Sequence, residues 1–547
     1  MDNNHLLKME KIKIEGFSDE RWMPIVNGID LTLDRGEVLG LIGESGAGKS
    51  TLGLASMAYT RQGCRISSGS IVFDGIELTN GDKDALRDLR GSRIAYVAQS
   101  AAASFNPAHR LIKQYAETPV QHGLMSHSEA EEKAVNIYRR LLLPDPERIG
   151  YRYPHQVSGG QLQRAMVAMA MSCRPDIIIF DEPTTALDVT TQIEVLSAIK
   201  DITRRFNTAA IYITHDLAVV AQIADRIMVL RYGNLVEENN AREMIAAPKE
   251  EYTRKLLSVR TLKEDKDLAQ SEKDIILEVN NVTASYTGTV NVLENIDLKI
   301  RRGRTVALVG ESGSGKSTLA RVITGLLPPS EGSVVYNGNE LTRDLKSRPK
   351  EQLRVMQMIY QMPDTALNPK QKVNKIIGRP LQFYFGMNDK ECEKRVYELL
   401  EKIELSEKYY DRYPPELSGG EKQRICIARA LAAEPDLIIC DEVTSALDQL
   451  VAEEILKLLQ DLQNELKVSY LFITHDLATV KAISDEIVVM LQGRIVEQGV
   501  KKEILTPPHH EYTDLLLSSV PEMDPDWLDN LLEDRKAKGK PSSIMDA

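Results

Sequence analysis

Long apolar runs are missing from the 547 residues of this sequence. No uninterrupted apolar stretch approaches the roughly 18 residues that a membrane-spanning helix needs. Residues 1–11 also lack the apolar core of a signal peptide. These two absences predict a cytoplasmic protein with no transmembrane segment of its own.

Cysteine is scarce, and its spacing fits no metal site. None of the five cysteines belongs to a CxxC pair or to another metal-ligand pattern. We therefore expect no disulfide and no metal cluster. Cys392 and Cys440 fall in a helix-like run and at the end of an apolar strand, which favours buried thiols.

Positive charge is also in deficit. The chain has 68 Lys and Arg residues against 80 Asp and Glu residues, for a net charge of −12. This balance argues against a broad nucleic-acid-binding face, although it leaves room for a local basic patch.

What the sequence does contain is two copies of the pattern GxxxxGK[ST], at residues 43–51 and 310–318. Each copy follows an apolar run, at 38–42 and 305–309, so each predicts a strand, a glycine loop and a helix start. Glycines let the backbone N–H groups turn around an anion, and the helix adds its positive end. The predicted phosphate-binding residues are Gly43, Gly46, Gly48, Lys49, Ser50 and Thr51, and Gly310, Gly313, Gly315, Lys316, Ser317 and Thr318. The lysines would reach the β- and γ-phosphates of a nucleotide, and Ser50 and Ser317 would place hydroxyls on Mg²⁺.

The repeat extends along the whole chain. The pairs Ser158/Ser418, Asp181/Asp441 and His215/His475 share one spacing, and Lys49/Lys316 are slightly farther apart. We therefore predict a first domain at residues 1–259, a charged linker at 260–273, and a second domain at 274–523. Residues 524–547 would form a short helix and a disordered tail.

Apolar, β-branched runs at 176–180 and 209–214 predict buried parallel strands. Alternating polar and apolar residues at 11–17 predict a further strand. Residues 28–33 continue towards the strand that precedes the first phosphate loop. Residues 128–143 predict a helix that opens on a capping box between Ser128 and Glu131.

Paired carboxylates follow one apolar strand in each half. They are Asp181 with Glu182, and Asp441 with Glu442. Alone, such a pair is more often a solvated turn. Repeated in step with the phosphate loops, it predicts an aspartate that holds Mg²⁺ through water and a glutamate that polarises the attacking water.

A glutamine and a histidine also recur after strands in both halves. Gln99 and Gln361 close strand-like segments, where an amide could sense Mg²⁺ and the γ-phosphate. His215 and His475 stand in identical Ile-Thr-His-Asp-Leu-Ala segments, where an imidazole could donate to the γ-phosphate. Each residue alone would be incidental, but the repetition favours a catalytic role.

A second candidate anion site opens a helix in each half. It consists of Ser158, Gly159 and Gly160 in the first half, and of Ser418, Gly419 and Gly420 in the second. A serine and two glycines at a helix start make an anion nest, and the alternative is a plain helix cap and turn.

In this order, the motifs resemble those of ATP-binding cassette (ABC) ATPases over nearly the whole chain. The resemblance implies an α/β fold of two tandem P-loop ATPase domains. Each domain would have a RecA-like parallel-sheet core, an antiparallel β subdomain and a helical subdomain that carries the signature, at residues 157–161 and 417–421. It also implies ATP and Mg²⁺ as cofactors.

In this family, two cassettes close head to tail on two ATP molecules. The resemblance therefore implies that the loop, Gln99, Asp181, Glu182 and His215 of the first half share one site with the signature of the second half. The second site would combine the corresponding residues of the second half with the signature of the first. These residues are the second loop, Gln361, Asp441, Glu442 and His475. Aromatic residues upstream of the loop stack on adenine in the family. Tyr286 fits this role and Phe17 fits it moderately, with packing in the core as the alternative.

The finer resemblance is to the importer ATPases for oligopeptides, dipeptides and nickel. Asn-Pro segments follow each glutamine, at 106–107 and 368–369, and tails with Glu-Tyr-Thr stand at 251–253 and 511–513. Departures are few: Val157, Glu421 and Val443 replace leucine, glutamine and proline, and none removes a catalytic group. The cysteine cluster that some members carry near the C-terminus is absent.

The resemblance implies an ATPase subunit peripheral to the cytoplasmic face of the cell membrane. It would drive integral membrane permease subunits, with an extracytoplasmic substrate-binding protein delivering a peptide or related small solute, and with no nucleic acid as partner. The rival is a soluble twin-cassette ATPase that acts on ribosomes or nucleic acid, against which the short linker and the acidic charge argue. A pair of cassettes for vitamin-type uptake is a third hypothesis.

Overall fold

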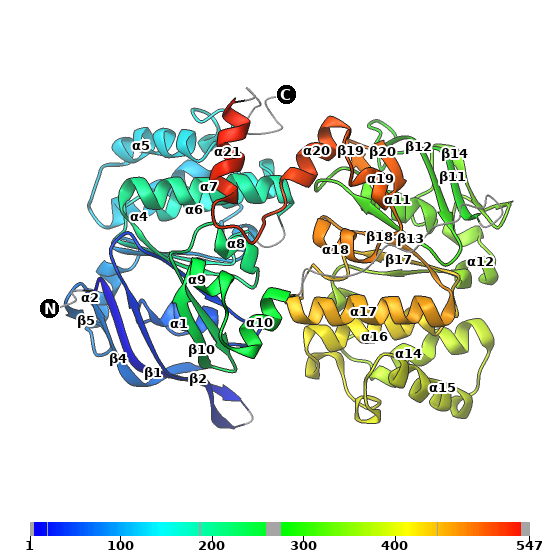
Figure 1. Ribbon diagram of the computed structural model, residues 1–547, viewed down its shortest axis with the longest axis horizontal. Helices are drawn as coiled ribbons and strands as arrows, with labels where there is room; N and C mark the ends of the chain where they lie inside the picture. Colours follow the sequence, from blue (N-terminus) through cyan, green and yellow to red (C-terminus); the bar gives the residue numbers. More distant parts are fainter. Residues whose placement is uncertain (1–4, 19, 185–186, 259–274, 446, 538–547) are drawn as a thin grey trace. The chain divides into compact units, whose positions relative to one another are not determined.

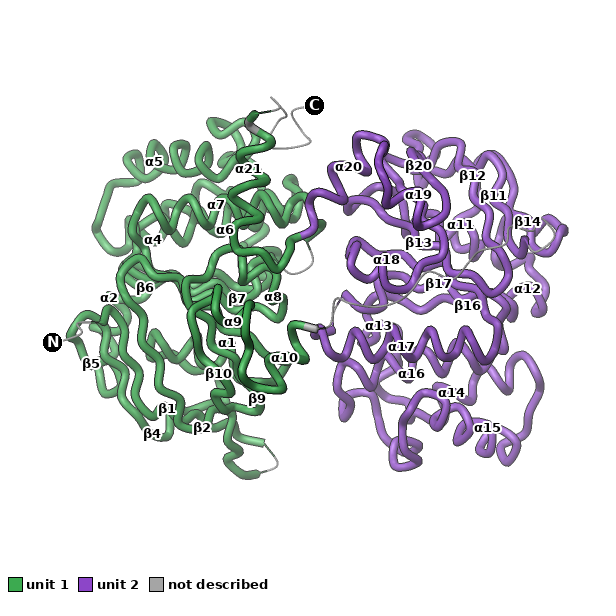
Figure 2. Tube along the Cα trace, in the orientation of Figure 1, with its two compact units in different colours: residues 1–258, 521–547 green, residues 259–520 purple. Residues whose placement is uncertain are grey.

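The computed structural model describes residues 5–18, 20–184, 187–258, 275–445 and 447–537. The chain forms two compact units (Figure 2). The first unit contains the described residues up to Ser258 together with those from Pro521 onward, and the second contains the described residues from 275 to Val520. The predicted linker and the predicted disordered tail lie outside the described residues.

The core of the first unit is a six-stranded sheet in the order β10-β9-β3-β8-β7-β6. Its strands are β3 (Val38–Ile42), β6 (Ile94–Val97), β7 (Ile177–Asp181), β8 (Ala209–Ile213), β9 (Arg226–Arg231) and β10 (Asn234–Asn240). All pairings are parallel except that of β9 with β10. Every residue of β3, β7 and β8 is buried, as expected for parallel strands covered on both faces.

A four-stranded antiparallel sheet packs on this core in the order β2-β1-β4-β5. Its strands are β1 (Leu7–Ser18), β2 (Arg21–Leu33), β4 (Cys64–Phe73) and β5 (Ile76–Glu77). Apolar residues from both sheets form one hydrophobic core, in which Leu7, Met9, Leu39 and Ile179 are fully buried.

Helices complete the first unit (Figure 1). They are α1 (Lys49–Ala55), α2 (Lys83–Leu89), α3 (Ala101–Ser104), α4 (Leu111–Gln121), α5 (His127–Arg140), α6 (Gly159–Ala170), α7 (Val189–Phe206), α8 (Leu217–Ala221), α9 (Ala241–Ala246), α10 (Glu251–Ser258) and α21 (Trp527–Ala537). Short 3-10 turns lie at Ile149–Tyr151 and Pro154–Gln156.

The second unit repeats this plan, with sheets in the orders β16-β17-β18-β13-β19-β20 and β12-β11-β14-β15. Its strands are β11 (Ile275–Ala284), β12 (Leu293–Arg301), β13 (Thr305–Val309), β14 (Glu331–Tyr336), β15 (Asn339–Glu340), β16 (Met356–Ile359), β17 (Leu437–Asp441), β18 (Ser469–Ile473), β19 (Glu486–Leu491) and β20 (Arg494–Val500). Its α-helices are α11 (Lys316–Ile323), α12 (Lys350–Val355), α13 (Pro363–Ala366), α14 (Val373–Pro380), α15 (Asp389–Lys402), α16 (Gly419–Leu431), α17 (Gln449–Leu466), α18 (Leu477–Ile483), α19 (Lys501–Ile504) and α20 (Glu511–Ser518). The repeated α/β fold predicted from the sequence is confirmed.

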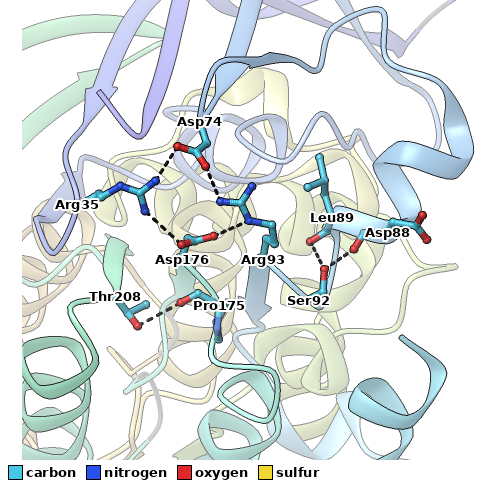
Figure 3. A network of polar contacts seen from close by, with 9 residues as sticks. All are labelled: Arg35, Asp74, Asp88, Leu89, Ser92, Arg93, Pro175, Asp176 and Thr208. Carbon is cyan, nitrogen blue, oxygen red and sulfur yellow. Dashed lines mark hydrogen bonds and ion pairs between the residues drawn. The ribbon is translucent and has the colours of Figure 1, made fainter. Parts of the chain in front are cut away.

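A closed ring of two arginines and two aspartates joins the two sheets of the first unit (Figure 3). Asp74, after β4, accepts from Arg35 and Arg93 at 2.6 and 2.7 Å. Asp176, before β7, accepts from the same two guanidinium groups at 3.3 and 2.7 Å. In the second unit Asn337 stands in place of Asp74, and it accepts from Arg302 at 2.9 Å. The ring ties the turn after β4 to the turns that precede β3, β6 and β7.

The strand predictions agree with the structure to within a few residues, but one helix start was wrong. The capping box of α5 joins Ser126 to Glu129, not Ser128 to Glu131. The segment from Ser126 to Glu131 contains two overlapping Ser-x-x-Glu matches, and the chain uses the earlier one. Cys392 and Cys440 are buried as predicted, and all five cysteines are free.

Residues 521–537 pack on the first unit, and the internal repeat does not predict this contact. Leu528 of α21 is fully buried. The side chain of Gln222 donates to the carbonyl oxygens of Glu522 and Asp524 at 2.7 and 3.0 Å, and it accepts from the backbone N–H of Leu528 at 3.0 Å. Ion pairs of Asp526 with Arg242, and of Asp529 with Lys200 and Arg204, add to the contact. We call residues 521–537 the C-terminal segment.

No helix within the described ranges has both the length and the apolar character needed to cross a membrane.

Candidate functional site

The phosphate loop of the first unit joins β3 to α1. Gly43 has a φ of +148°, and a Cβ there would stand 2.1 Å from the carbonyl oxygen of Leu230, so only glycine fits. Lys49 is buried, and its ammonium group donates to the carbonyl oxygens of Gly43 and Glu44 at 2.7 and 2.9 Å. The backbone of the loop therefore fixes the position of the lysine ammonium group.

The loop between β13 and α11 has the same geometry. Gly310 has a φ of +150°, and the ammonium group of Lys316 donates to the carbonyl oxygens of Gly310 and Glu311, both at 2.8 Å. In both units, the other two predicted glycines also have positive φ: Gly46, Gly48, Gly313 and Gly315. Thr51 and Thr318 follow in the first turn of each helix.

Oxygen ligands suited to Mg²⁺ lie beside each loop. The hydroxyl of Ser50 donates to Asp181 at 2.7 Å, and that of Ser317 donates to Asp441 at 3.0 Å. Both aspartates are buried, and burial raises the pKa of Asp441. Among the described residues, no three His, Cys, Asp or Glu side chains form a metal cage. A hydroxyl and one carboxylate, completed by phosphate oxygens and water, is a donor set that Mg²⁺ accepts.

Glu182 lies beyond β7 and is held from two sides. Gln99 Nε2 donates to one carboxylate oxygen at 2.8 Å, and Nδ1 of His215 lies 3.3 Å from the other. Glu182 also has a φ of +49°, which is rare for a residue with a side chain. The structure therefore brings together the three side chains predicted to carry catalysis in the first half.

The second unit repeats this triad. Gln361 Nε2 donates to Glu442 at 2.6 Å, Nδ1 of His475 lies 3.3 Å from the same carboxylate, and Glu442 has a φ of +50°. Burial alone would lower the pKa of His475, but the hydrogen bond and charge of Glu442 outweigh it, so the pKa lies above the usual value. In the first unit, the pKa of His215 is raised for the same reasons, with Glu182 as its partner. Each histidine is thus biased towards its protonated, donating form.

The two sites differ at the aspartate. The hydroxyl of Tyr96 in β6 donates to Asp181 at 2.6 Å. Met358 occupies the corresponding position in β16, three residues before the glutamine. Sequence reasoning missed Tyr96, because its role depends on β6 lying beside β7 in the folded sheet.

The signature segments start α6 and α16. Ser158 and Ser418 are N-caps, and each takes part in a capping box with the residue three positions on, Gln161 or Glu421. Gly160 is required by packing, because a Cβ there would lie 2.1 Å from Thr191 of α7. At Gly420 the same added atom would lie 2.5 Å from Val451 of α17.

From the sequence, a plain helix cap and an anion nest are alternatives for these segments. In the structure one segment can serve as both. Ser158, Gly159, Ser418 and Gly419 are exposed, so their helix N-termini can still receive an anion. Their role towards a nucleotide stays a prediction.

The aromatic residues predicted to contact adenine lie at the surface. Phe17 is 55% exposed and contacts Trp22 edge to face, and Tyr286 is 52% exposed. The hydroxyl of Tyr286 accepts from Arg321 at 2.8 Å and lies 3.2 Å from the Thr318 hydroxyl, beside the second loop. Their exposure argues against the alternative of core packing.

Two tandem cassettes with these motifs define the ABC class of ATPases. The sequence profile of the family "ABC transporter" matches residues 26–185 and 293–445, and the chain belongs to this family. A second profile, "Oligopeptide/dipeptide transporter, C-terminal region", matches residues 496–546. The chain is therefore an ATPase of the peptide-type importer group, as its motifs predicted.

Curated relatives agree with this assignment. The chain is 37% identical over 567 residues to the "Glutathione import ATP-binding protein GsiA" of Salmonella choleraesuis, covering 96% of this chain and 91% of that protein. The protein of the same name from Escherichia coli K12 is 36% identical, and the alignment again covers 96% of this chain and 91% of that protein.

Among solved structures, the archaeal ribosome recycling factor aABCE1, in complex with the ribosomal stalk protein aP1, has a TM-score of 0.60. The match covers 90% of each chain at 20% identity, and this likeness extends to the fold alone.

Proposed function

We propose that this chain hydrolyses ATP to drive the import of short peptides, or of solutes built like them, through a separate membrane permease. The observation that carries the proposal is the oligopeptide/dipeptide region at residues 496–546, which follows two segments that match the ABC transporter family. The relatives named for glutathione import support a solute of peptide character.

The permease would consist of integral membrane subunits, and the chain would lie on the cytoplasmic face of the membrane. An extracytoplasmic binding protein would supply the solute. We expect no nucleic acid partner, because the chain is acidic overall and the likeness to the ribosome recycling factor is one of fold.

ATP would bind on the two phosphate loops, with Lys49 and Lys316 on its phosphates. Mg²⁺ would be held by Ser50 and Ser317 directly, and by Asp181 and Asp441 through water, with Gln99 and Gln361 close by. When bound, Mg²⁺ neutralises charge on the phosphates. Glu182 and Glu442 would each accept a proton from the attacking water, and His215 and His475 would donate to the γ-phosphate.

We infer further that each ATP site is composite. Ser418, Gly419 and Gly420 would complete the site of the first loop, and Ser158, Gly159 and Gly160 that of the second. The support is the exposure of both serines at helix N-termini, which suit a phosphate, together with the family's head-to-tail arrangement. ATP binding would then close the two cassettes, and hydrolysis with product release would reopen them.

Replacing the signature serine tests the composite site. Ser418→Arg should abolish hydrolysis at the first site, although Lys49 lies far away in the sequence, because a bulky cation would block the approach of ATP. Single-turnover hydrolysis of radiolabelled ATP is the measurement, and Ser128→Arg, at an exposed position of α5, is the control. A rate for Ser418→Arg equal to that of the control would refute the composite site.

The solute is tested on the assembled transporter. The chain, purified with its permease subunits in lipid nanodiscs and supplied with the binding protein, should show ATPase activity that di- and tripeptides stimulate several-fold. Vitamins and free amino acids serve as comparison solutes. Stimulation by vitamins alone, or co-purification with ribosomes in place of membrane proteins, would overturn the proposal.

A further inference from the structure

A tyrosine from the tail of each cassette reaches its phosphate loop. The hydroxyl of Tyr252, in α10, accepts the backbone N–H of Glu44 at 3.2 Å. The hydroxyl of Tyr512, in α20, accepts the backbone N–H of Glu311 at 2.9 Å. The same contact is present at the equivalent position of both units, so the arrangement is not peculiar to one loop.

The peptide group that each tyrosine contacts is the one that holds the loop lysine. The N–H of Glu44 and the carbonyl of Gly43 belong to a single planar peptide group. That carbonyl accepts from the Lys49 ammonium at 2.7 Å. In the second unit, the carbonyl of Gly310 accepts from Lys316 at 2.8 Å. A hydroxyl fixed on one end of the plane therefore sets the direction of the oxygen at the other end.

The flexible glycine before this peptide explains why an external support is useful. Gly43 and Gly310 have φ values of +148° and +150°, in a region open to glycine, so the loop backbone itself restrains the plane weakly. The part-buried N–H of this peptide group also gains from an acceptor outside the loop, because an unpaired donor shielded from water is costly.

Each tyrosine is itself held firmly. Tyr252 and Tyr512 are 6% and 5% exposed. The Arg231 guanidinium lies 4.5 Å from the centre of the Tyr252 ring. The carboxylate of Glu237, in β10, accepts the N–H groups of Lys249 and Glu250 at 2.9 and 3.1 Å, just before α10 begins. The tail therefore presents its hydroxyl from a fixed position.

We propose that Tyr252 and Tyr512 are positioning residues for ATP binding: each orients the peptide group on which the phosphate-binding lysine rests. In the sequence analysis, the Glu-Tyr-Thr tails served only to identify a subfamily. On this proposal they also support the nucleotide site. Their hydroxyls contact the loop backbone, so they act on ATP affinity more than on the chemical step.

Removal of the two hydroxyls tests this role. Tyr→Phe substitution keeps the buried ring and deletes only the hydroxyl, with the hydrogen bonds that it makes to the loop. The double variant Tyr252→Phe/Tyr512→Phe should bind ATP roughly fivefold more weakly, the effect of about one hydrogen bond per site. Isothermal titration with ATP and Mg²⁺ measures the affinity. The KM for ATP should rise by the same factor, with kcat within about twofold of the parent.

Matched variants separate positioning from packing. Tyr151→Phe removes an exposed hydroxyl and should bind ATP normally. Tyr252→Leu removes the ring as well, and should lower the melting temperature, which Tyr252→Phe should leave almost unchanged. ATP affinity equal to the parent in the double phenylalanine variant would overturn the proposal. A lower melting temperature in that variant with unchanged affinity would also overturn it. Neither measurement requires the permease or the transported solute, so this result stands apart from the proposed transport.

Discussion

At the scale of residues, the two glutamates beyond β7 and β17 are restrained both at the backbone and at the carboxylate. Glu182 and Glu442 have left-handed backbone conformations that side chains rarely adopt. Their backbone N–H groups donate to Ile213 and Ile473 at 2.9 Å, and their carboxylates are held by a glutamine and a histidine. An unfavourable backbone conformation thus accompanies a fixed carboxylate position in each unit.

Replacing either glutamate by glutamine should separate binding from hydrolysis. Glu182→Gln and Glu442→Gln keep the shape of the side chain but remove the proton acceptor, so turnover should fall by about 10²–10³-fold. ATP binding should be nearly unchanged, because neither carboxylate belongs to the phosphate loop. Steady-state phosphate release and ATP titration measure the two effects.

Glu340→Gln, at an exposed position of β15, removes a charge from a residue outside the predicted catalytic and binding residues, and it should leave turnover unchanged. Near-normal hydrolysis in one of the two glutamate variants would identify that site as auxiliary. The Tyr96 contact with Asp181, which Met358 cannot reproduce, is a structural reason to compare the two sites separately.

Most site residues could be predicted, because their order along the chain is repeated. Lys49, Asp181, Glu182 and His215 follow strands whose carboxyl ends meet at one sheet edge. Tyr96 and Tyr252 could not be predicted, because their roles depend on which segment lies beside them in space. No spacing in the sequence links the hydroxyl of a tyrosine in a strand or a tail to the group that it contacts.

At the scale of elements, the ring of Arg35, Asp74, Arg93 and Asp176 predicts a pH dependence (Figure 3). The hydrogen bond from Arg93 holds the pKa of Asp74 below its usual value. A carboxylate with a lowered pKa stabilises the fold above the unfolded pKa of about 3.9, and this contribution is lost as the pH falls through the folded pKa.

Asp74→Asn should therefore lower the melting temperature of the first unit by about 1–3 °C near neutral pH. The difference should shrink as the pH falls below about 4. Scanning calorimetry across pH is the measurement, and Asn337→Asp in the second unit is the reciprocal variant. A difference that stays constant down to pH 3 would contradict an electrostatic origin.

Strands were easier to predict than helix ends. β3 and β13 match their apolar runs because burial on both faces demands continuous apolar sequence. The start of α5 was wrong because the serines at 126 and 128 satisfy the same local rule, and only the packing of Ala130, Ala134 and Ile137 decides between them.

At the scale of the whole molecule, the C-terminal segment should hold the two halves of the chain together. A protease site inserted within residues 260–273 would cut the chain there. After cleavage without nucleotide, the two fragments should still co-elute, because residues 521–537 of the second fragment bind the first. Leu528→Asp should release them, since it places a charge at a fully buried position.

Asn530→Asp adds the same carboxylate at an exposed position two residues away, and should leave the fragments together. Size-exclusion chromatography of the cleaved proteins at micromolar concentration compares the variants. Co-elution of the Leu528→Asp fragments would show that another contact holds the halves, and loss of co-elution in both variants would point to a general effect of charge.

The C-terminal segment, residues 521–537, is structurally part of the first cassette. A stop codon after Val520 would spare every motif of both ATP sites, yet it would remove the backbone partners of Gln222 and expose the surface that Leu528 covers. A mutation in the codons for residues 521–537 would therefore damage the first cassette, although those codons follow all the motifs of the second.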